Sequence, residues 1–259
     1  MLKVDATELE IKVKEMYRQV AEEPHGAYHF EMGRKLAERL GYPADLLDQI
    51  PVGAIESFAG VGYFLDLANL CAGERVMDLG SGSGMDSFIA ALQVGSTGRV
   101  VGVDFTAAQL AKARRLAADA GVGHVEFREG RIDALPAEAS DSVDCVISNG
   151  VINLSPDKEV VFREAARVLR PGGRLAVADI VTQTQLTEAI VCNADLWASC
   201  IGGAAQQDAY RTAIEDAGLR IEQTRTNPYQ FISDQALGAS ATYGVHSISV
   251  LAVKPAPRS

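Results

Sequence analysis

Short apolar runs alternate with amphipathic segments through the middle of the chain. Five such runs lie at 74–80, 99–105, 124–130, 142–150 and 173–181. The segments between them carry apolar residues at helical spacing. Apolar strands separated by helices of about 10 to 15 residues are typical of a parallel sheet that is covered on both faces. The pattern therefore predicts a Rossmann-like, doubly wound α/β core at residues 51–180.

The N-terminal part of the chain has the periodicity of helices. Residues 8–23 carry apolar positions at helical spacing up to the interruption by Pro24 and Gly26. A second helical pattern covers residues 29–41 and ends at a glycine. We therefore expect residues 1–50 to form a helical N-terminal cap.

The C-terminal part departs from the alternation of strands and helices. Residues 181–259 begin with a long insertion, which we interpret as a lid, followed by a helix pattern at 208–218. Two strand-like runs at 219–226 and 246–254 follow without a helical repeat between them. We expect these runs to complete a mostly parallel, seven-stranded sheet, with an antiparallel strand at its edge.

The composition indicates a globular protein that acts on small molecules. Apolar residues make up 47% of the 259 residues, which is enough for a buried core. Acidic residues outnumber basic residues by 34 to 24, and no dense Lys/Arg cluster offers a surface for nucleic acid or an anionic membrane. The sequence has neither a signal-peptide pattern nor an apolar run long enough to span a membrane. We expect a cytoplasmic protein with a small-molecule partner, and a homodimer remains open.

A glycine-rich loop follows the first predicted strand of the core. Residues 78–84 read Asp-Leu-Gly-Ser-Gly-Ser-Gly, at the point where a strand turns into a helix. Glycines permit a tight turn there and a close approach of the backbone to a ligand. A dinucleotide-binding G-x-G-x-x-G loop would need glycine at position 85, where this chain has methionine. The candidate ligand contacts in the loop are Asp78, Gly80, Ser81 and Gly82.

The ends of the next two strands supply candidate contacts to a nucleoside. Asp104 lies about 20 residues after the loop, where a carboxylate can accept both hydroxyls of a ribose. Phe105 is placed to lie against an adenine face. After the third strand, a backbone amide and the Asp133 carboxylate could read the adenine edge, or Asp133 could cap a turn. The candidate contacts at these strand ends are Asp104, Phe105, Thr106, Arg131, Ile132 and Asp133.

The fourth predicted strand ends in Ser-Asn-Gly at residues 148–150. Ligands of doubly wound sheets bind at the carboxyl ends of the strands, near the point where the strand order reverses. Asn149 is therefore a candidate contact to the reactive part of the ligand or to a nucleophile. Its alternative role is that of a turn residue before glycine.

Several segments together resemble one known family. DLGSGSGMD, GVDFT, VISNGVINLSPDK, ARVLRPGG and LWASCIGGA are similar to the arsenite methyltransferase branch of class I S-adenosylmethionine-dependent methyltransferases, over about residues 55–205. The resemblance implies S-adenosylmethionine as the cofactor and methyl transfer as the reaction. It also implies cofactor-binding roles for Gly80, Ser81, Gly82, Asp104, Phe105, Ile132, Asp133 and Asn149.

The resemblance is incomplete where the branch binds trivalent arsenic through cysteines. Val61 and Gly150 stand at two of those cysteine positions, and Cys200 stands at a third. Trivalent arsenic prefers thiolates, and one thiol cannot form a three-coordinate site. Cys192 lies about 12 Å from Cys200 along an unbroken helix, at roughly 1.5 Å per residue. We therefore expect a small organic acceptor, with methylation of arsenite or another soft element through Cys200 as the alternative.

Side chains of the cap and the lid are candidates for the acceptor pocket. His25 and His29 would share one face of a helix, and His29 is the candidate acid–base residue if the nucleophile carries a proton. Gly26 weakens this helix and no third ligand is evident, so we predict no metal site. Ordinary surface or core positions are the alternative for both histidines and for the aromatic residues. The candidate pocket residues are Tyr17, His25, Phe58, Trp197 and Cys200.

Two further interpretations come from other functional classes. A nicotinamide-dependent oxidoreductase would use a similar fold, but Met85 disfavours its glycine loop. A non-catalytic module that binds S-adenosylmethionine as a sensor or partner subunit would carry the same cofactor contacts. Formation of S-adenosylhomocysteine with a panel of acceptors separates an enzyme from such a module.

Overall fold

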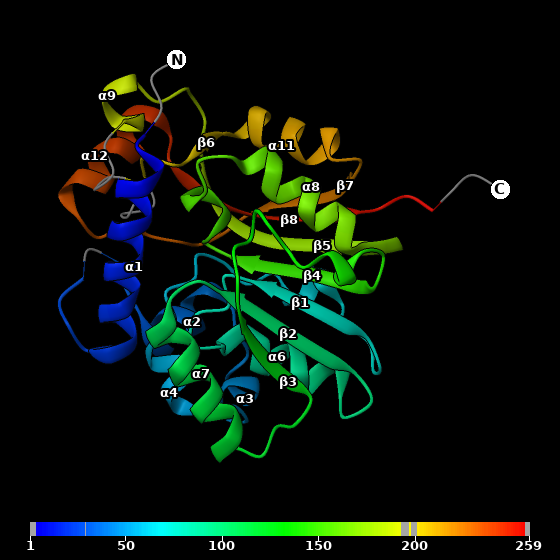
Figure 1. Ribbon diagram of the computed structural model, residues 1–259. Helices are drawn as coiled ribbons and strands as arrows, with labels where there is room; N and C mark the ends of the chain where they lie inside the picture. Colours follow the sequence, from blue (N-terminus) through cyan, green and yellow to red (C-terminus); the bar gives the residue numbers. More distant parts are fainter. Residues whose placement is uncertain (1–3, 29, 193–196, 198–200, 257–259) are drawn as a thin grey trace.

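A single twisted sheet forms the centre of the protein. The computed structural model describes residues 4–28, 30–192, 197 and 201–256. The strand order is β3-β2-β1-β4-β5-β8-β7, and β6 pairs with β5 away from this path (Figure 1). The strands are β1 (Arg75–Leu79), β2 (Arg99–Asp104), β3 (Val125–Glu129), β4 (Val143–Asn149), β5 (Leu169–Thr182), β6 (Ala205–Gln206), β7 (Arg220–Thr226) and β8 (His246–Val253).

The first five strands are parallel, as the five apolar runs predicted. β1 lies between β2 and β4, and the chain reverses its direction of travel across the sheet at this point. The carboxyl ends of β1, β2 and β4 therefore meet at one edge, and α1 (Ala6–Glu22) stands on that side of the sheet, at the left in Figure 1. This edge is where a doubly wound sheet binds ligands.

The C-terminal strands form the predicted antiparallel part of the sheet. β8 is antiparallel to both of its neighbours, β5 and β7, so it lies between them while β7 occupies the edge. The two-residue strand β6 adds an eighth strand that the sequence did not predict. The segment between β7 and β8 also contains a helix, α12 (Asp234–Tyr243).

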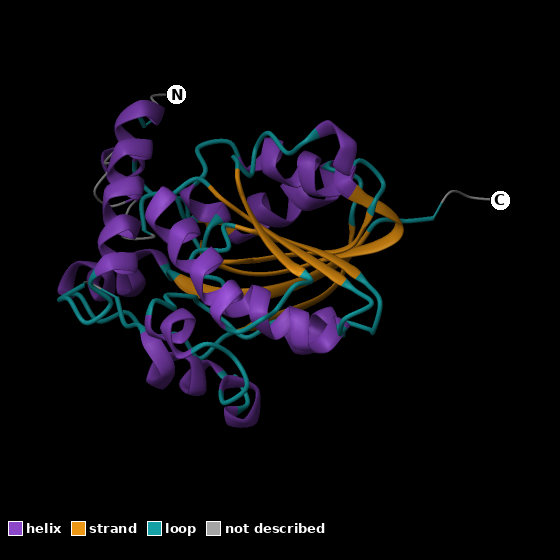
Figure 2. Ribbon diagram, turned by 60° about the horizontal axis from the view of Figure 1, so that its bottom comes forward, coloured by secondary structure: helices purple, strands orange, loops and turns teal. Residues whose placement is uncertain are grey.

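Helices cover both faces of the sheet (Figure 2). Alternate residues of each buried strand point to opposite faces, so the apolar runs supply two separate cores. One core includes α6 (Met85–Val94) and α7 (Ala107–Asp119), and the other includes α8 (Lys158–Val168) and α11 (Gln207–Asp216). The lid region contains the short helix α9 (Glu188–Val191).

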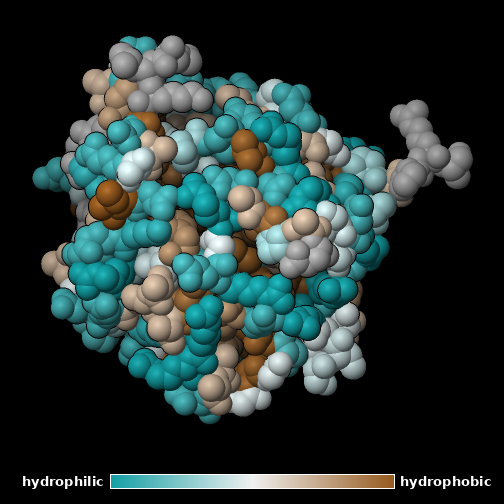
Figure 3. Space-filling view, viewed as in Figure 1, coloured by the Kyte–Doolittle hydropathy of each residue, from teal (hydrophilic) through white to brown (hydrophobic). Residues whose placement is uncertain are grey.

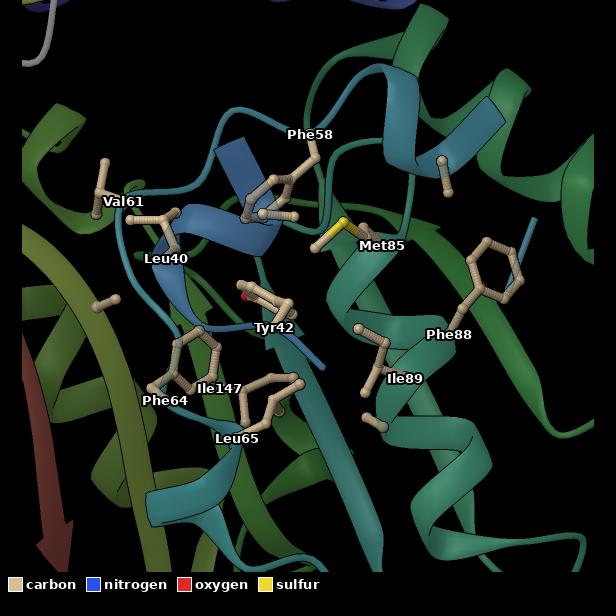
Figure 4. Close-up of a cluster of buried hydrophobic side chains, with 14 of the residues drawn as sticks. Leu40, Tyr42, Phe58, Val61, Phe64, Leu65, Met85, Phe88, Ile89 and Ile147 are labelled. Atoms are coloured by element: carbon tan, nitrogen blue, oxygen red, sulfur yellow. The ribbon is translucent and has the colours of Figure 1, made fainter. Parts of the chain in front are cut away.

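Residues 33–68, from the second half of the predicted cap to the segment before β1, belong to the core beside α6. The elements here are α2 (Gly33–Leu40), α3 (Ala44–Leu47), α4 (Val52–Glu56) and α5 (Leu65–Ala68). Tyr42 and Phe58 pack edge to face, with ring centroids 5.2 Å apart. Figure 4 shows these rings beside Met85 and Ile89 of α6. These N-terminal segments therefore help to position the beginning of α6.

The surface view in Figure 3 is mostly hydrophilic, with hydrophobic residues in small separate patches. Within the described part of the chain, no helix is both long and apolar enough to cross a membrane. The described residues also include no group of three or more His, Cys, Asp and Glu side chains that could hold a metal ion.

Candidate functional site

The glycine loop after β1 turns sharply toward α6. Gly80 adopts a φ of +73°, which favours glycine, and a Cβ atom there would lie 2.4 Å from the Val151 side chain. The backbone N–H groups of Gly80 and Ser81 both donate to the Val103 carbonyl of β2, at 2.7 and 3.1 Å. The loop is therefore held against the next strand, and only glycine fits at its first turn.

Asp104 at the end of β2 joins the loop to the start of α7. Its carboxylate accepts hydrogen bonds from the backbone N–H groups of Gly82, at 2.9 Å, and Thr106, at 2.8 Å. The side chain is buried, and this burial raises the pKa of the carboxyl group above its usual value. Each carboxylate oxygen retains a further acceptor site, which a ribose hydroxyl could use.

The loop and the strand ends line a single cavity. The predicted contacts that line it are Asp78, Gly80, Ser81, Gly82, Asp104, Phe105, Thr106, Ile132 and Asn149. The hydroxyl of Ser81 is buried at this cavity and has no hydrogen-bond partner among the described residues. A buried orphan hydroxyl beside a glycine cradle fits a polar ligand that approaches the backbone closely. The residues present therefore fit the predicted cofactor.

A second cavity adjoins the first beneath the N-terminal half of α1. Phe105 and Ile132 line both cavities, whereas Arg131 and Asp133 line only the second. The Arg131 guanidinium donates to both oxygens of Asp133, at 2.9 and 3.0 Å, and it also pairs with Glu10 of α1. Arg131 and Asp133 thus pair with each other beside the expected adenine position.

Asn149 is held by protein groups on every side. Its Oδ1 accepts from the Val61 backbone N–H at 2.8 Å. Its Nδ2 lies 2.9 Å from Asp86 Oδ2, and 3.0 Å from both the Tyr42 hydroxyl and the Gly62 carbonyl. The amide group therefore fixes residues 60–62 against the cavity wall, in a set of contacts that the spacing of these residues did not predict.

The sequence did not predict the roles of Asp86, which lines the cavity, and of Tyr42, which contacts it from the core. The Tyr42 hydroxyl donates to Asp86 Oδ1 at 2.6 Å, and Asp86 lines the cavity from the first turn of α6. An acidic residue directly after the glycine loop was the available signal for Asp86. Tyr42 had no such signal, because 44 positions separate it from its partner.

Only some of the residues predicted for the acceptor pocket line the cavity. Tyr17 and Phe58 line the first cavity. His25 is exposed and is not among the described residues that line either cavity. Trp197 is buried elsewhere, where its ring faces the Lys158 ammonium at 4.9 Å and its Nε1 donates to the Val191 carbonyl at 2.6 Å. His29 and Cys200 lie outside the described residues.

Val61 and Gly150, which stand at two cysteine positions of the resembling branch, are neighbours in space. A Cβ atom at Gly150 would lie 3.3 Å from the Val61 side chain, and Val61 is buried. Of the cysteines in the described residues, Cys145 is buried in β4, and Cys71 and Cys192 are exposed. None of these three is among the described residues that line the cavity.

Comparison with known proteins places the chain among methyltransferases. Residues 70–218 match the model of a methyltransferase domain family. Arsenite methyltransferase from Halobacterium salinarum is 39% identical over 222 residues, which cover 85% of this chain and 56% of the relative. The enzyme of that name from Aquipseudomonas alcaligenes is 42% identical and covers 80% of this chain and 63% of the relative. The chain thus spans less than two thirds of the length of these curated relatives.

Solved structures agree with this placement. An arsenic(III) S-adenosylmethionine methyltransferase from Chlamydomonas reinhardtii superposes with a TM-score of 0.64 at 28% identity, and the match covers 88% of this chain and 75% of that one. A geranyl diphosphate C-methyltransferase from Streptomyces coelicolor has a TM-score of 0.67 at 19% identity, over 94% of this chain and 98% of that one. At that identity the second likeness establishes the fold alone.

Proposed function

The chain belongs to the class I S-adenosylmethionine-dependent methyltransferases, and from that premise we propose that it methylates a small molecule which the protein does not hold through a set of thiolates. The observation that carries the proposal is that Val61 and Gly150 are neighbours, since a Cβ atom at position 150 would lie 3.3 Å from the Val61 side chain. By the resemblance, the arsenite branch has cysteines at both positions. In this chain, valine occupies position 61 and glycine occupies position 150, so neither position has a thiol. Asn149 holds this segment through a hydrogen bond from the Val61 backbone N–H.

The cavity residues fit the cofactor in a definite order. Ser81 and the loop glycines would bind the methionyl end, Asp104 would hold the ribose, and Phe105 with Ile132 would enclose the adenine. S-adenosylmethionine supplies an electrophilic methyl group on a sulfonium. The acceptor's lone pair would take this methyl group, and S-adenosylhomocysteine would leave with the electrons of the carbon–sulfur bond.

The protein's contribution to this step is orientation and the exclusion of water. Tyr17 and Val13 of α1 and Phe58 of the adjoining segment line the cavity opposite the glycine loop. α1 is fixed over the cavity at its C-terminal half, where Gln109 donates to the Tyr17 carbonyl at 2.8 Å and Lys112 to the Ala21 carbonyl at 3.1 Å. These contacts support a role for the N-terminal helix as a cover over the methyl donor.

Arsenite is a second candidate acceptor, and the relatives favour it over an organic molecule. Two arsenite methyltransferases share 39% and 42% of their aligned residues with this chain. Cys200 is the thiol at a family position, and external thiols would have to complete the coordination of arsenic. The names of the relatives thus support arsenite, whereas positions 61 and 150 support an acceptor without thiolate ligands.

An acceptor panel distinguishes the two candidates. The enzyme is incubated with S-adenosylmethionine and, separately, with organic thiols, phenols, amines and arsenite plus a thiol reductant, and S-adenosylhomocysteine is measured. We expect turnover with an organic acceptor that is retained in Cys200→Ser. Robust formation of methylarsenicals that is lost in Cys200→Ser would overturn the proposal.

A restored thiol pair is the matched control for this experiment. The double variant Val61→Cys, Gly150→Cys places two thiols side by side, although the φ of +70° at position 150 strains any residue with a Cβ by about 1 kcal/mol or more. We expect this variant to bind arsenite more tightly than the wild type. Equal binding would mean that these two positions do not form the acceptor site.

A further inference from the structure

Three buried carboxylates line the cofactor cavity without a basic partner. Asp78 at the end of β1, Asp86 in α6 and Asp104 at the end of β2 are 3%, 6% and 8% exposed. None of the described residues that line this cavity is Lys, Arg or His. Two lysines on the helices around the cavity have other partners: Lys14 pairs with Glu10, and Lys112 donates to the Ala21 carbonyl and to the hydroxyl of Ser57, a residue of the cavity wall.

The groups that contact these carboxylates are neutral. Ser87 donates to Asp78 at 2.6 Å, Tyr42 and Asn149 donate to Asp86, and Asp104 accepts from two backbone N–H groups. Burial, together with the neighbouring carboxylates Asp86 and Asp104, raises the pKa of Asp78 to about 8. Burial likewise raises the pKa of Asp86 to about 6. The cavity therefore holds acidic groups that ionise only at a raised pH, and no basic side chain among its described lining residues balances their charge.

The cofactor and its product differ by one positive charge. S-adenosylmethionine carries a sulfonium, whereas S-adenosylhomocysteine has a neutral thioether at the same place. The buried, unpartnered Ser81 hydroxyl independently indicates a ligand at this cavity. The attraction between opposite charges is much stronger in a desolvated site than in water.

We propose that Asp78, Asp86 and Asp104 select the methyl donor over its product by charge. The carboxylates hold the cationic donor, and part of this attraction disappears when methyl transfer converts the sulfonium into a thioether, so the product leaves more readily. Asp86 is the residue to test, because it faces the cavity between the glycine loop and Asn149. The inference rests on cofactor binding and not on the identity of the acceptor.

Isothermal titration calorimetry between pH 6 and pH 8 tests the proposal. The ligands are S-adenosylhomocysteine and sinefungin, a non-transferable analogue with an ammonium group at the position of the sulfonium. A cationic ligand favours the ionised carboxylates, so its binding releases protons and its affinity rises with pH through their pKa values. We expect the ratio of sinefungin affinity to S-adenosylhomocysteine affinity to rise by about three- to tenfold over this range. A ratio that does not change with pH would overturn the proposal.

Two variants and a matched control localise the effect. Asp86→Asn should lower the affinity ratio at pH 8 by about tenfold, and Tyr42→Phe, which removes one donor to Asp86, should shift the rise to higher pH. Asp179→Asn is the control, because Asp179 is also buried and also accepts from a tyrosine hydroxyl, Tyr210 at 2.9 Å, but is not among the described residues that line the cavity. Equal changes in the ratio for Asp86→Asn and Asp179→Asn would contradict the proposal. A wild type that binds neither ligand would instead overturn the cofactor site itself.

Discussion

Buried acidic residues lie in two places, three in the cofactor cavity and Asp179 at the end of β5, and these two groups of contacts differ in how the acidic charge is balanced. In the cofactor cavity, the Tyr42 hydroxyl donates to Asp86 at 2.6 Å. At the end of β5, the Tyr210 hydroxyl donates to Asp179 at 2.9 Å. Burial raises the pKa of both carboxyl groups to about 6. The local construction of the two Asp–Tyr pairs is therefore similar.

The surroundings of the two pairs are opposite in charge. The Lys158 ammonium attracts the Asp179 carboxylate, and desolvation lowers the pKa of this lysine to about 8 although part of its side chain is exposed. Asp86 has no such neighbour among the described residues and instead raises the pKa of Asp78. The protein itself supplies a positive charge beside the carboxylate at β5. In the cavity, only a ligand could supply one. We interpret Asp179 and its partners at β5 as structural and the carboxylates of the cavity as functional.

The largest expected effect separates the two groups by ligand affinity. Asp104→Ala should weaken binding of S-adenosylhomocysteine on the order of 100-fold, because it leaves two ribose hydroxyls and the N–H groups of Gly82 and Thr106 without their acceptor. Asp179→Ala should change this affinity by less than about threefold. Calorimetry on both variants measures the difference, and comparable losses would remove the distinction between the groups.

In the absence of ligand, the substitution at β5 should cost more stability than the substitution in the cavity. Asp179→Ala leaves the buried Tyr210 hydroxyl and the Ile180 N–H without an acceptor and Lys158 without its counter-charge, so we expect a loss of about 3 kcal/mol. Asp86→Ala should cost about 1 kcal/mol, because the Tyr42 hydroxyl retains the Gly62 carbonyl at 3.3 Å and a charge repulsion is removed. Urea denaturation of both variants at pH 7 tests this order. A larger loss for Asp86→Ala would reverse our assignment.

The pH dependence of stability should show which group is uncompensated. The pKa of Asp78 is raised to about 8 in the folded protein, so the folded state binds more protons than the unfolded chain, and stability falls as pH rises toward 8. Between pH 6 and pH 8 we expect this group to lower the free energy of unfolding by about 2 kcal/mol. Asp78→Asn should remove that fall. Asp179→Asn should not, because a pKa of about 6 confines its contribution to lower pH.

The fold followed from the sequence because its signals are local and repeated. Each apolar run contains enough consecutive buried residues to define a strand, and the parallel arrangement then brings the ends of β1, β2 and β4 together. This reasoning predicted that the glycine loop, Asp104 and Asn149 would meet, and they line one cavity. The two-residue strand β6 was missed, because so short a strand depends on its pairing with β5 and not on its own pattern.

The contacts that decide chemistry were less predictable, because they join distant positions. Tyr42 reaches Asp86 only because the N-terminal segments pack on α6. The side-chain amide of Asn149 makes hydrogen bonds to groups that are distant from it in the sequence. Trp197 was a candidate for the acceptor pocket, yet it packs over Lys158. The sequence around an aromatic residue in a predicted lid does not indicate which buried group the aromatic ring packs against.

The smallest expected effect concerns Glu10, a carboxylate that is partly exposed and already paired. Glu10 of α1 accepts from Lys14 at 2.7 Å and pairs with Arg131 across the second cavity, and these partners lower the pKa of its carboxyl group. Solvent screens such pairs, so Glu10→Gln should reduce stability by only about 0.5 kcal/mol. It should weaken binding of S-adenosylhomocysteine by less than about threefold, and salt should reduce even this difference.

Glu8→Gln is the control for that measurement, because the Glu8–Lys12 pair, at 3.2 Å, lies wholly on α1 and does not cross the cavity. A small loss of affinity in Glu10→Gln that is absent in Glu8→Gln would show that the Glu10–Arg131 contact holds α1 over the ligand. A loss as large as that of Asp104→Ala would mean that a partly exposed ion pair matters as much as a buried carboxylate. That result would contradict the view that burial without compensation is what makes the cavity acids responsive to the charge of the cofactor.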